Sequence, residues 1–134
     1  MTFNFSDSWL LTSIRNAEES EYGATLKDVI AYADYSNHAI MNWEELRDGL
    51  LKLISLGLVI ENNHKLVTTK KFKEWWYENF NSKKRIYVHK QIELVQTYMN
   101  KAFSSFETEG EKKSIKLTED DYQNALREYL KMTD

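Results

Sequence analysis

The chain has 134 residues, 42% of them hydrophobic and 29% charged, and a formal net charge of −3, which predicts one packed domain and excludes a globally disordered chain. It has no cysteine, so disulfides, thiolate metal sites and cysteine nucleophiles are excluded. No apolar run reaches the roughly 20 residues that a membrane span needs, and we therefore expect a cytoplasmic protein that does not enter a membrane.

Two helices are predicted in the first third of the chain. Ser6 or Asp7 can cap the first, which runs for about a dozen residues with one apolar face. The second opens at Thr25, where Asp28 three positions later completes a capping pair. Residues 23–25 are too few for a free strand, but they can add an edge to a sheet formed elsewhere.

A third helix has the clearest boundaries. Asn42 caps it, Glu45 completes a capping box, and Gly57 supplies the left-handed residue that ends it. Gly49 lies in mid-helix, which indicates a close approach to the backbone that tight packing inside the domain would explain. The apolar stripe of this helix is formed by Trp43, Leu46, Leu50, Leu53 and Ile54.

A short β-hairpin is predicted next. Residues 58–61 and 65–68 are rich in β-prone side chains, and they flank asparagines that tolerate the positive φ of a tight turn. Thr68 or Thr69 then caps a fourth helix. Its inner face carries aromatic side chains, namely Phe72, Trp75, Trp76 and Phe80.

A break at residues 81–85 divides the chain into a domain of residues 1–82 and a helical extension of residues 83–134. The first extension helix has apolar residues at alternating spacings of four and three, which is the pattern of a coiled-coil seam. The seam residues are Val88, Ile92, Val95, Met99, Ala102 and Phe106. Such a seam can pair two chains or pack back on the first helix, and we expect a homodimer.

A polar stretch near residues 104–116 predicts a mobile linker. Thr118 and Asp121 then open a last helix. The apolar face of that helix is formed by Tyr122, Ala125, Leu126, Tyr129 and Leu130.

The order of three helices, a hairpin and a helix resembles the winged helix-turn-helix superfamily over roughly residues 7–80. The resemblance rests on the apolar run of residues 50–59 with its Gly57-Leu58-Val59 exit, on the wing tip at Asn62-Asn63, and on residues 67–71, which open the next helix. It implies a mainly α fold with a small β-hairpin, in which a winged-helix core is followed by C-terminal helices.

The resemblance also implies a function and the residues that serve it. In this superfamily the third helix commonly enters the DNA major groove, the wing touches the backbone or minor groove, and an added long helix often makes a dimer. The candidate nucleic-acid contacts by position are Asn42, Arg47, Lys52, His64, Lys65, Lys70, Lys71 and Lys73. A non-catalytic DNA-binding or transcription-regulatory protein is therefore expected, with duplex DNA as its partner.

The charge distribution moves the expected contact away from the third helix. Residues 1–64 carry 4 basic and 10 acidic side chains, whereas residues 65–90 carry 8 and 2. Phosphate attraction needs Lys and Arg facing the duplex, so we expect the wing and the fourth helix to contribute more than the third. The alternative is that these lysines only solvate an aromatic-rich helix.

Two other binding functions fit the pattern. The acidic third helix could form the partner surface of a protein–protein interaction adaptor, because a fold does not determine a function. A small-molecule sensor could instead hold a ligand between the core and the long helix, lined by Trp75, Trp76 and Met99. We expect neither a cofactor nor a metal ion for either function.

The sequence argues against an enzyme. His38, His64 and His89 match no metal-binding spacing, and no phosphate-cradling glycine loop or nucleophile motif is present. Adjacent acids at Glu44-Glu45 and Asp120-Asp121 open helices, where the helix dipole favours negative charge. They are interpreted as capping acids without a general acid or base role.

Overall fold

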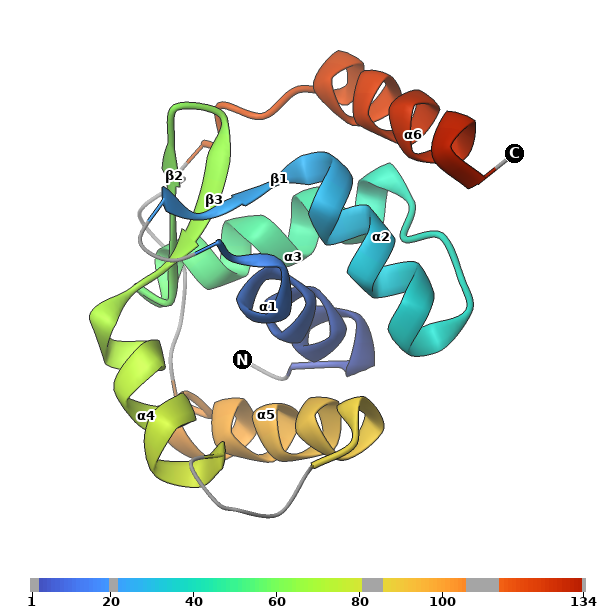
Figure 1. Cartoon of the computed structure of the whole chain (residues 1–134). Coiled ribbons are helices and arrows are strands. Elements are labelled where there is room, and N and C mark those ends of the chain that lie inside the picture. Colours follow the sequence, from blue (N-terminus) through green and yellow to red (C-terminus); the bar gives the residue numbers. More distant parts are fainter. Residues whose placement is uncertain (1–2, 20–21, 81–85, 106–113, 134) are drawn as a thin grey trace.

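The computed structural model describes residues 3–19, 22–80, 86–105 and 114–133 (Figure 1). It is mainly helical with a small antiparallel sheet, which confirms the predicted fold class. The elements in chain order are α1 (Phe5–Ala17), β1 (Ala24–Thr25), α2 (Leu26–Asn37), α3 (Trp43–Ser55), β2 (Val59–Asn62), β3 (Lys65–Thr68), α4 (Lys70–Phe80), α5 (Val88–Ala102) and α6 (Glu119–Thr133).

The sheet has the strand order β1-β3-β2, and both pairs of strands are antiparallel. Ala24 in β1 pairs with Leu66 in β3, so the predicted short edge is present. The hairpin turn consists of Asn63 and His64, which have φ values of 51° and 63°. Two consecutive residues with positive φ form a tight turn whose twist suits the flanking strands.

Helix α1 lies at the centre of the fold, in contact with α2, α3 and α5. The predicted cap was wrong by a few residues, because Asn4 caps this helix and Asp7 occupies the third helical position. Asn4 accepts a hydrogen bond from the Asp7 backbone at 3.1 Å, and Asp7 accepts one from the Asn4 backbone at 3.0 Å. The polar side chains of Ser8 and Ser13 are buried as well, because neighbours enclose the helix on several sides.

Helix α3 has the predicted boundaries, since Asn42 and Glu45 form a reciprocal capping box and Gly57 has a φ of 72°. A methyl group added at Gly49 would lie 3.0 Å from Leu10 Cδ2 and 3.5 Å from Asp7 Oδ1. Tight packing of α3 on α1 therefore explains the mid-helix glycine.

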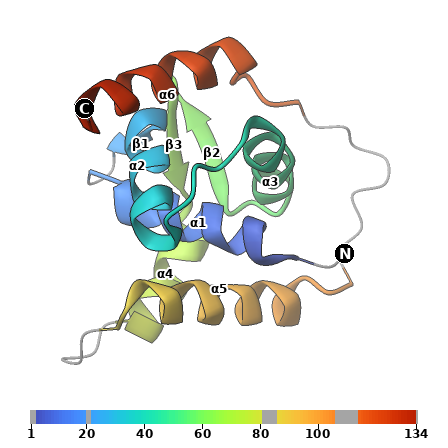
Figure 2. The same ribbon diagram turned by 90° about the vertical axis from the view of Figure 1, so that its right-hand side faces the viewer.

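The two extension helices lie on opposite sides of residues 3–68, which we call the core unit (Figures 1 and 2). Helix α5 packs against α1, and α6 packs against α2. The division at residue 82 and most of the predicted linker lie outside the described residues, but Leu117 is buried. No helix in the described part of the chain is long and apolar enough to cross a membrane.

The predicted coiled-coil seam of α5 faces its own chain. Ile92, Val95 and Met99 are buried in the core, and the Ile92 carbonyl accepts a 2.5 Å hydrogen bond from the Ser8 hydroxyl of α1. The prediction that these three residues pair two chains is therefore wrong, because α1 already covers them. Val88 is half-buried and Ala102 exposed, while Phe106 lies outside the described residues.

Candidate nucleic-acid interface

The tip of the wing and the start of α3 both lie beside α6, and in Figure 2 the hairpin strands point toward that helix. Glu61 of β2 accepts hydrogen bonds from the backbone of Lys116 at 2.8 Å and of Leu117 at 2.9 Å, just before α6. The Tyr122 hydroxyl donates to the Met41 carbonyl at 2.6 Å, next to the residue that caps α3. The candidate interface thus has two parts, the wing tip and the amino end of α3, and residues 116–122 contact both the wing and α3.

Two candidate contacts form the exposed end of the wing. His64 is an exposed turn residue, and Lys65 begins β3 with a half-buried side chain. His64 belongs to the hairpin turn, and Lys65 pairs with Asn62 at the end of the hairpin next to that turn. The wing tip, residues 62–65, therefore carries two of the candidate contacts.

The amino-terminal part of α3 contributes two more candidates. Asn42 is exposed, and its side-chain oxygen accepts the Glu45 backbone N–H at 2.8 Å as the helix cap. Arg47 is paired with Asp48 at 3.0 Å. The pair with Asp48 reduces the positive charge that α3 can offer to a phosphate.

Two other candidate lysines are held by buried carboxylates. Lys52 Nζ lies 2.9 Å from Asp7 Oδ2, so its charge faces α1. Lys73 Nζ lies 3.3 Å from Glu18 Oε2 and donates a 2.5 Å hydrogen bond to the Thr68 carbonyl. Both lysines therefore join elements of the fold that are far apart in sequence.

The remaining candidates lie on α4, beyond the base of the wing. Lys70 is exposed and 3.7 Å from Glu74, and Lys71 Nζ lies 4.7 Å from the ring centroid of Phe103. Because β3 runs from Lys65 at the tip to Thr68 at the base, the cations of α4 and those of the wing tip are at opposite ends of the hairpin. The structure does not bring all eight predicted contacts to one surface.

None of the family models, curated proteins or solved structures compared with this chain matches it. Function is therefore inferred from the geometry and charge of the chain itself. Within the residues that the structure describes, no group of three or more His, Asp or Glu side chains is placed to hold a metal ion.

Sequence reasoning did not predict how α6 attaches to the core unit. Tyr129 donates a 2.6 Å hydrogen bond from its hydroxyl to Asp34 on α2, and the Tyr122 ring lies 6.0 Å from the Trp43 ring on α3. Both tyrosines belong to the apolar face predicted for the last helix. An apolar helix face indicates that another element packs on it, but the spacing of its residues does not show which element this is.

The surroundings of three side chains of α6 shift their pKa values. Burial raises the pKa of Tyr122 above its usual value, and the charges of Glu44 and Glu45 add to the effect. The hydrogen bond to Asp34 raises the pKa of Tyr129. Hydrogen bonds from Thr118 lower the pKa of Asp121, and the nearby charge of His64 lowers it further.

We expect the attachment of α6 to weaken at alkaline pH. A raised tyrosine pKa in the folded chain means that the neutral hydroxyl is favoured there, so its contribution is complete below about pH 10 and is lost as the pH rises through the folded pKa. The free energy of unfolding, measured in urea from pH 8 to 11, should therefore fall in the upper part of this range. A variant with both Tyr122→Phe and Tyr129→Phe should show a smaller fall, and an equal fall would contradict the assignment.

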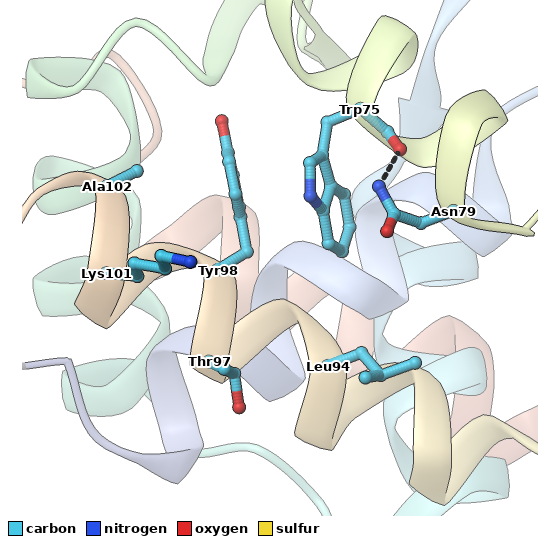
Figure 3. A pocket seen from close by; sticks show the side chains of 7 residues that line it. All are labelled: Trp75, Asn79, Leu94, Thr97, Tyr98, Lys101 and Ala102. Atoms are coloured by element: carbon cyan, nitrogen blue, oxygen red, sulfur yellow. Dashed lines mark hydrogen bonds between the residues drawn. The ribbon is translucent and has the colours of Figure 1, made fainter.

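A separate groove lies between α4 and α5, with a volume of ≈ 490 Å³ (Figure 3). Trp75 lines it, as the ligand-sensor hypothesis requires, whereas Trp76 and Met99 are buried in the core. The Trp75 and Tyr98 rings stack on each other with centroids 4.5 Å apart, and Asn79 donates to the Trp75 carbonyl. Because the two rings are in contact with each other, there is no space between them for a planar ligand.

Proposed function

We propose that this chain is a non-catalytic winged-helix module that binds duplex DNA in a regulatory role, through the wing tip and the amino end of α3. The proposal is supported by the element order from α1 to β3 and by the sheet order β1-β3-β2. The observation that carries it is the position of the hairpin turn, which lies on the same side of the core unit as the start of α3 (Figure 1). A wing and a helix end on one side suit simultaneous contact with the backbone and a groove.

The charge of the interface predicts modest, salt-sensitive binding. Arg47 and Lys52 are paired with carboxylates, and Glu44 and Asp48 are exposed on α3. Few cations are then available to displace counterions from DNA, so affinity should depend on phosphate contacts near the wing tip.

Lys65→Ala should weaken binding to duplexes of any sequence and reduce the slope of log affinity against log salt by about 1, because one phosphate contact is lost. Fluorescence anisotropy of a labelled 20-base-pair duplex between low and physiological salt measures both quantities. The matched control is Lys90→Ala, since Lys90 is an exposed lysine on α5, on the side of the core unit away from α6. The DNA proposal would be wrong if the native chain did not bind the duplex at low salt, or if its affinity did not change with salt concentration.

A protein–protein adaptor is the second candidate, and the exposure of Glu44 and Asp48 on α3 favours it. Glu45 is less available, because its carboxylate accepts hydrogen bonds from Ser6 at 2.9 Å and from the Asn42 backbone at 3.2 Å. Charge reversal at Glu44 and Asp48 together therefore tests this surface without disturbing the cap. Loss of a captured protein partner would support the adaptor, and unchanged capture would count against it.

A further inference from the structure

Helix α6 spans the side of the core unit that the proposed function assigns to DNA (Figures 1 and 2). Its leading segment is bound by Glu61 near the wing tip, and its first turns contact Met41 and Trp43 at the start of α3. Farther along, Tyr129 reaches Asp34 on α2. Residues 116–122 thus contact both the wing and the start of α3, so a duplex that touches both would meet this segment.

The charge at the start of α6 strengthens this competition. The first turn of the helix carries Glu119, Asp120 and Asp121. Asp121 lies close enough to His64 for their charges to interact, and Lys116 and Leu117 line one small cavity with the turn residues of the wing. The carboxylate of Asp121 therefore lies near the wing tip, where the proposed function would place a phosphate.

The contacts that hold α6 on the core unit are mainly apolar. Its buried side chains are Tyr122 and Ala125, while Leu126 and Tyr129 are only partly buried. None of the ion pairs found among the described residues joins α6 to the core unit. The attachment includes one apolar face, two tyrosine hydroxyls and, just before the helix, the carboxylate of Glu61.

We propose that α6 and the segment that leads into it are an intramolecular competitor of DNA, which contacts both β2 of the wing and the start of α3 and must leave them before a duplex can bind both. This inference rests on the proposed function, because it describes the regulation of the same surface. Only chains in which α6 is released can bind, so the apparent affinity for DNA equals the intrinsic affinity multiplied by the released fraction. Since coupling between two binding equilibria is reciprocal, bound DNA must in turn favour the released helix.

Hydrogen exchange on the native full-length chain tests this reciprocity directly. The probe is a 20-base-pair duplex of mixed sequence at low salt, added at saturating concentration. We expect amides of residues 119–133 to exchange faster in the complex, while amides of residues 59–68 exchange more slowly. Wing protection with unchanged or greater protection of residues 119–133 would overturn the competitor role and leave the proposed function standing. No binding and no change at either segment would overturn both.

Substitutions at the two hydroxyls provide a second measurement. Tyr129→Phe and Tyr122→Phe each remove one hydrogen bond that holds α6 and keep the aromatic ring, so each should raise the apparent affinity for the duplex about fivefold. Tyr87→Phe is the matched control, because Tyr87 is 75% exposed just before α5 and should leave affinity unchanged. Far-UV circular dichroism and urea unfolding confirm that each variant is folded. Affinity that stays constant or falls in both folded variants would overturn the competitor role.

Discussion

Glu18→Gln is expected to lower the free energy of unfolding by about 2–3 kcal/mol, because it removes the charge from a buried carboxylate that holds two cations. The Glu18 side chain is 1% exposed, and its Oε2 lies 3.3 Å from Lys73 Nζ. Oε1 lies 3.9 Å from Arg15 Nη1, and the carboxylate also accepts hydrogen bonds from the backbone and hydroxyl of Thr68. Glutamine replaces one of these acceptors with a donor, so at least one partner is left unsatisfied.

Urea unfolding at neutral pH measures the loss, and Glu19→Gln is the matched control. Glu19 is the next residue and its side chain is exposed, so the same chemical change there should alter stability by less than about 0.5 kcal/mol. Equal unfolding midpoints for the two variants would contradict the role assigned to Glu18. A double-mutant cycle with Lys73→Met should show coupling, because each single variant leaves a charge behind that the other would remove.

The ion pair between Glu18 and Lys73 affects how lysine variants are interpreted. Lys73 was predicted to contact DNA, yet its partners lie within the fold, so Lys73→Ala should change stability as well as any affinity. Lys70→Ala should leave stability nearly unchanged, because the ion pair of Lys70 with Glu74 is exposed to solvent. A loss of affinity in a Lys73 variant therefore has to be corrected for its loss of stability, whereas one in a Lys70 variant does not.

Gly23→Ala is expected to cost about 3 kcal/mol, because a positive φ and a steric clash act together. Gly23 has a φ of 86°, and an added Cβ would lie 2.6 Å from Val67 Cγ2 and 2.9 Å from the Leu66 carbonyl oxygen. Leu66 is the residue that pairs with Ala24, so the clash falls at the point where β1 joins the sheet.

Gly57→Ala separates the two contributions. Gly57 has a φ of 72°, similar to that of Gly23, but an added Cβ would meet nothing within 4 Å. Its cost should therefore be only the conformational part, about 1 kcal/mol. Both variants are measured by urea unfolding, and equal losses would show that the contact with β3 contributes nothing at Gly23.

Local signals in the sequence were enough to predict the elements, because they depend on residues a few positions apart. The Asn42–Glu45 capping box, the Gly57 stop and the hairpin are all of this kind. The cap of α1 was missed because Ser6 and Asp7 have capping chemistry too, and only the structure shows that Asp7 serves Asn4 as its third helical residue.

Tertiary partners were not predictable from the same signals. The seam of α5 has a spacing that suits a second chain and α1 equally well, so periodicity alone left its partner open. The cations were counted as one basic block, but Lys52 and Lys73 find carboxylates 45 and 55 positions earlier in the chain. Counting charges along the sequence cannot show which lysines are paired with distant carboxylates.

The central position of α1 has a consequence for the order in which the chain can fold. The Phe3 backbone N–H bonds to the Asn100 side chain at 2.9 Å, and Asn16 bonds to Gln91 at 2.9 Å, so the first helix is enclosed by one of the last. During synthesis α1 leaves the ribosome before α5, and the surface that covers it follows some 75 to 97 residues later. Contacts over such separations form slowly, so a nascent chain exposes the apolar side of α1 until α5 has emerged.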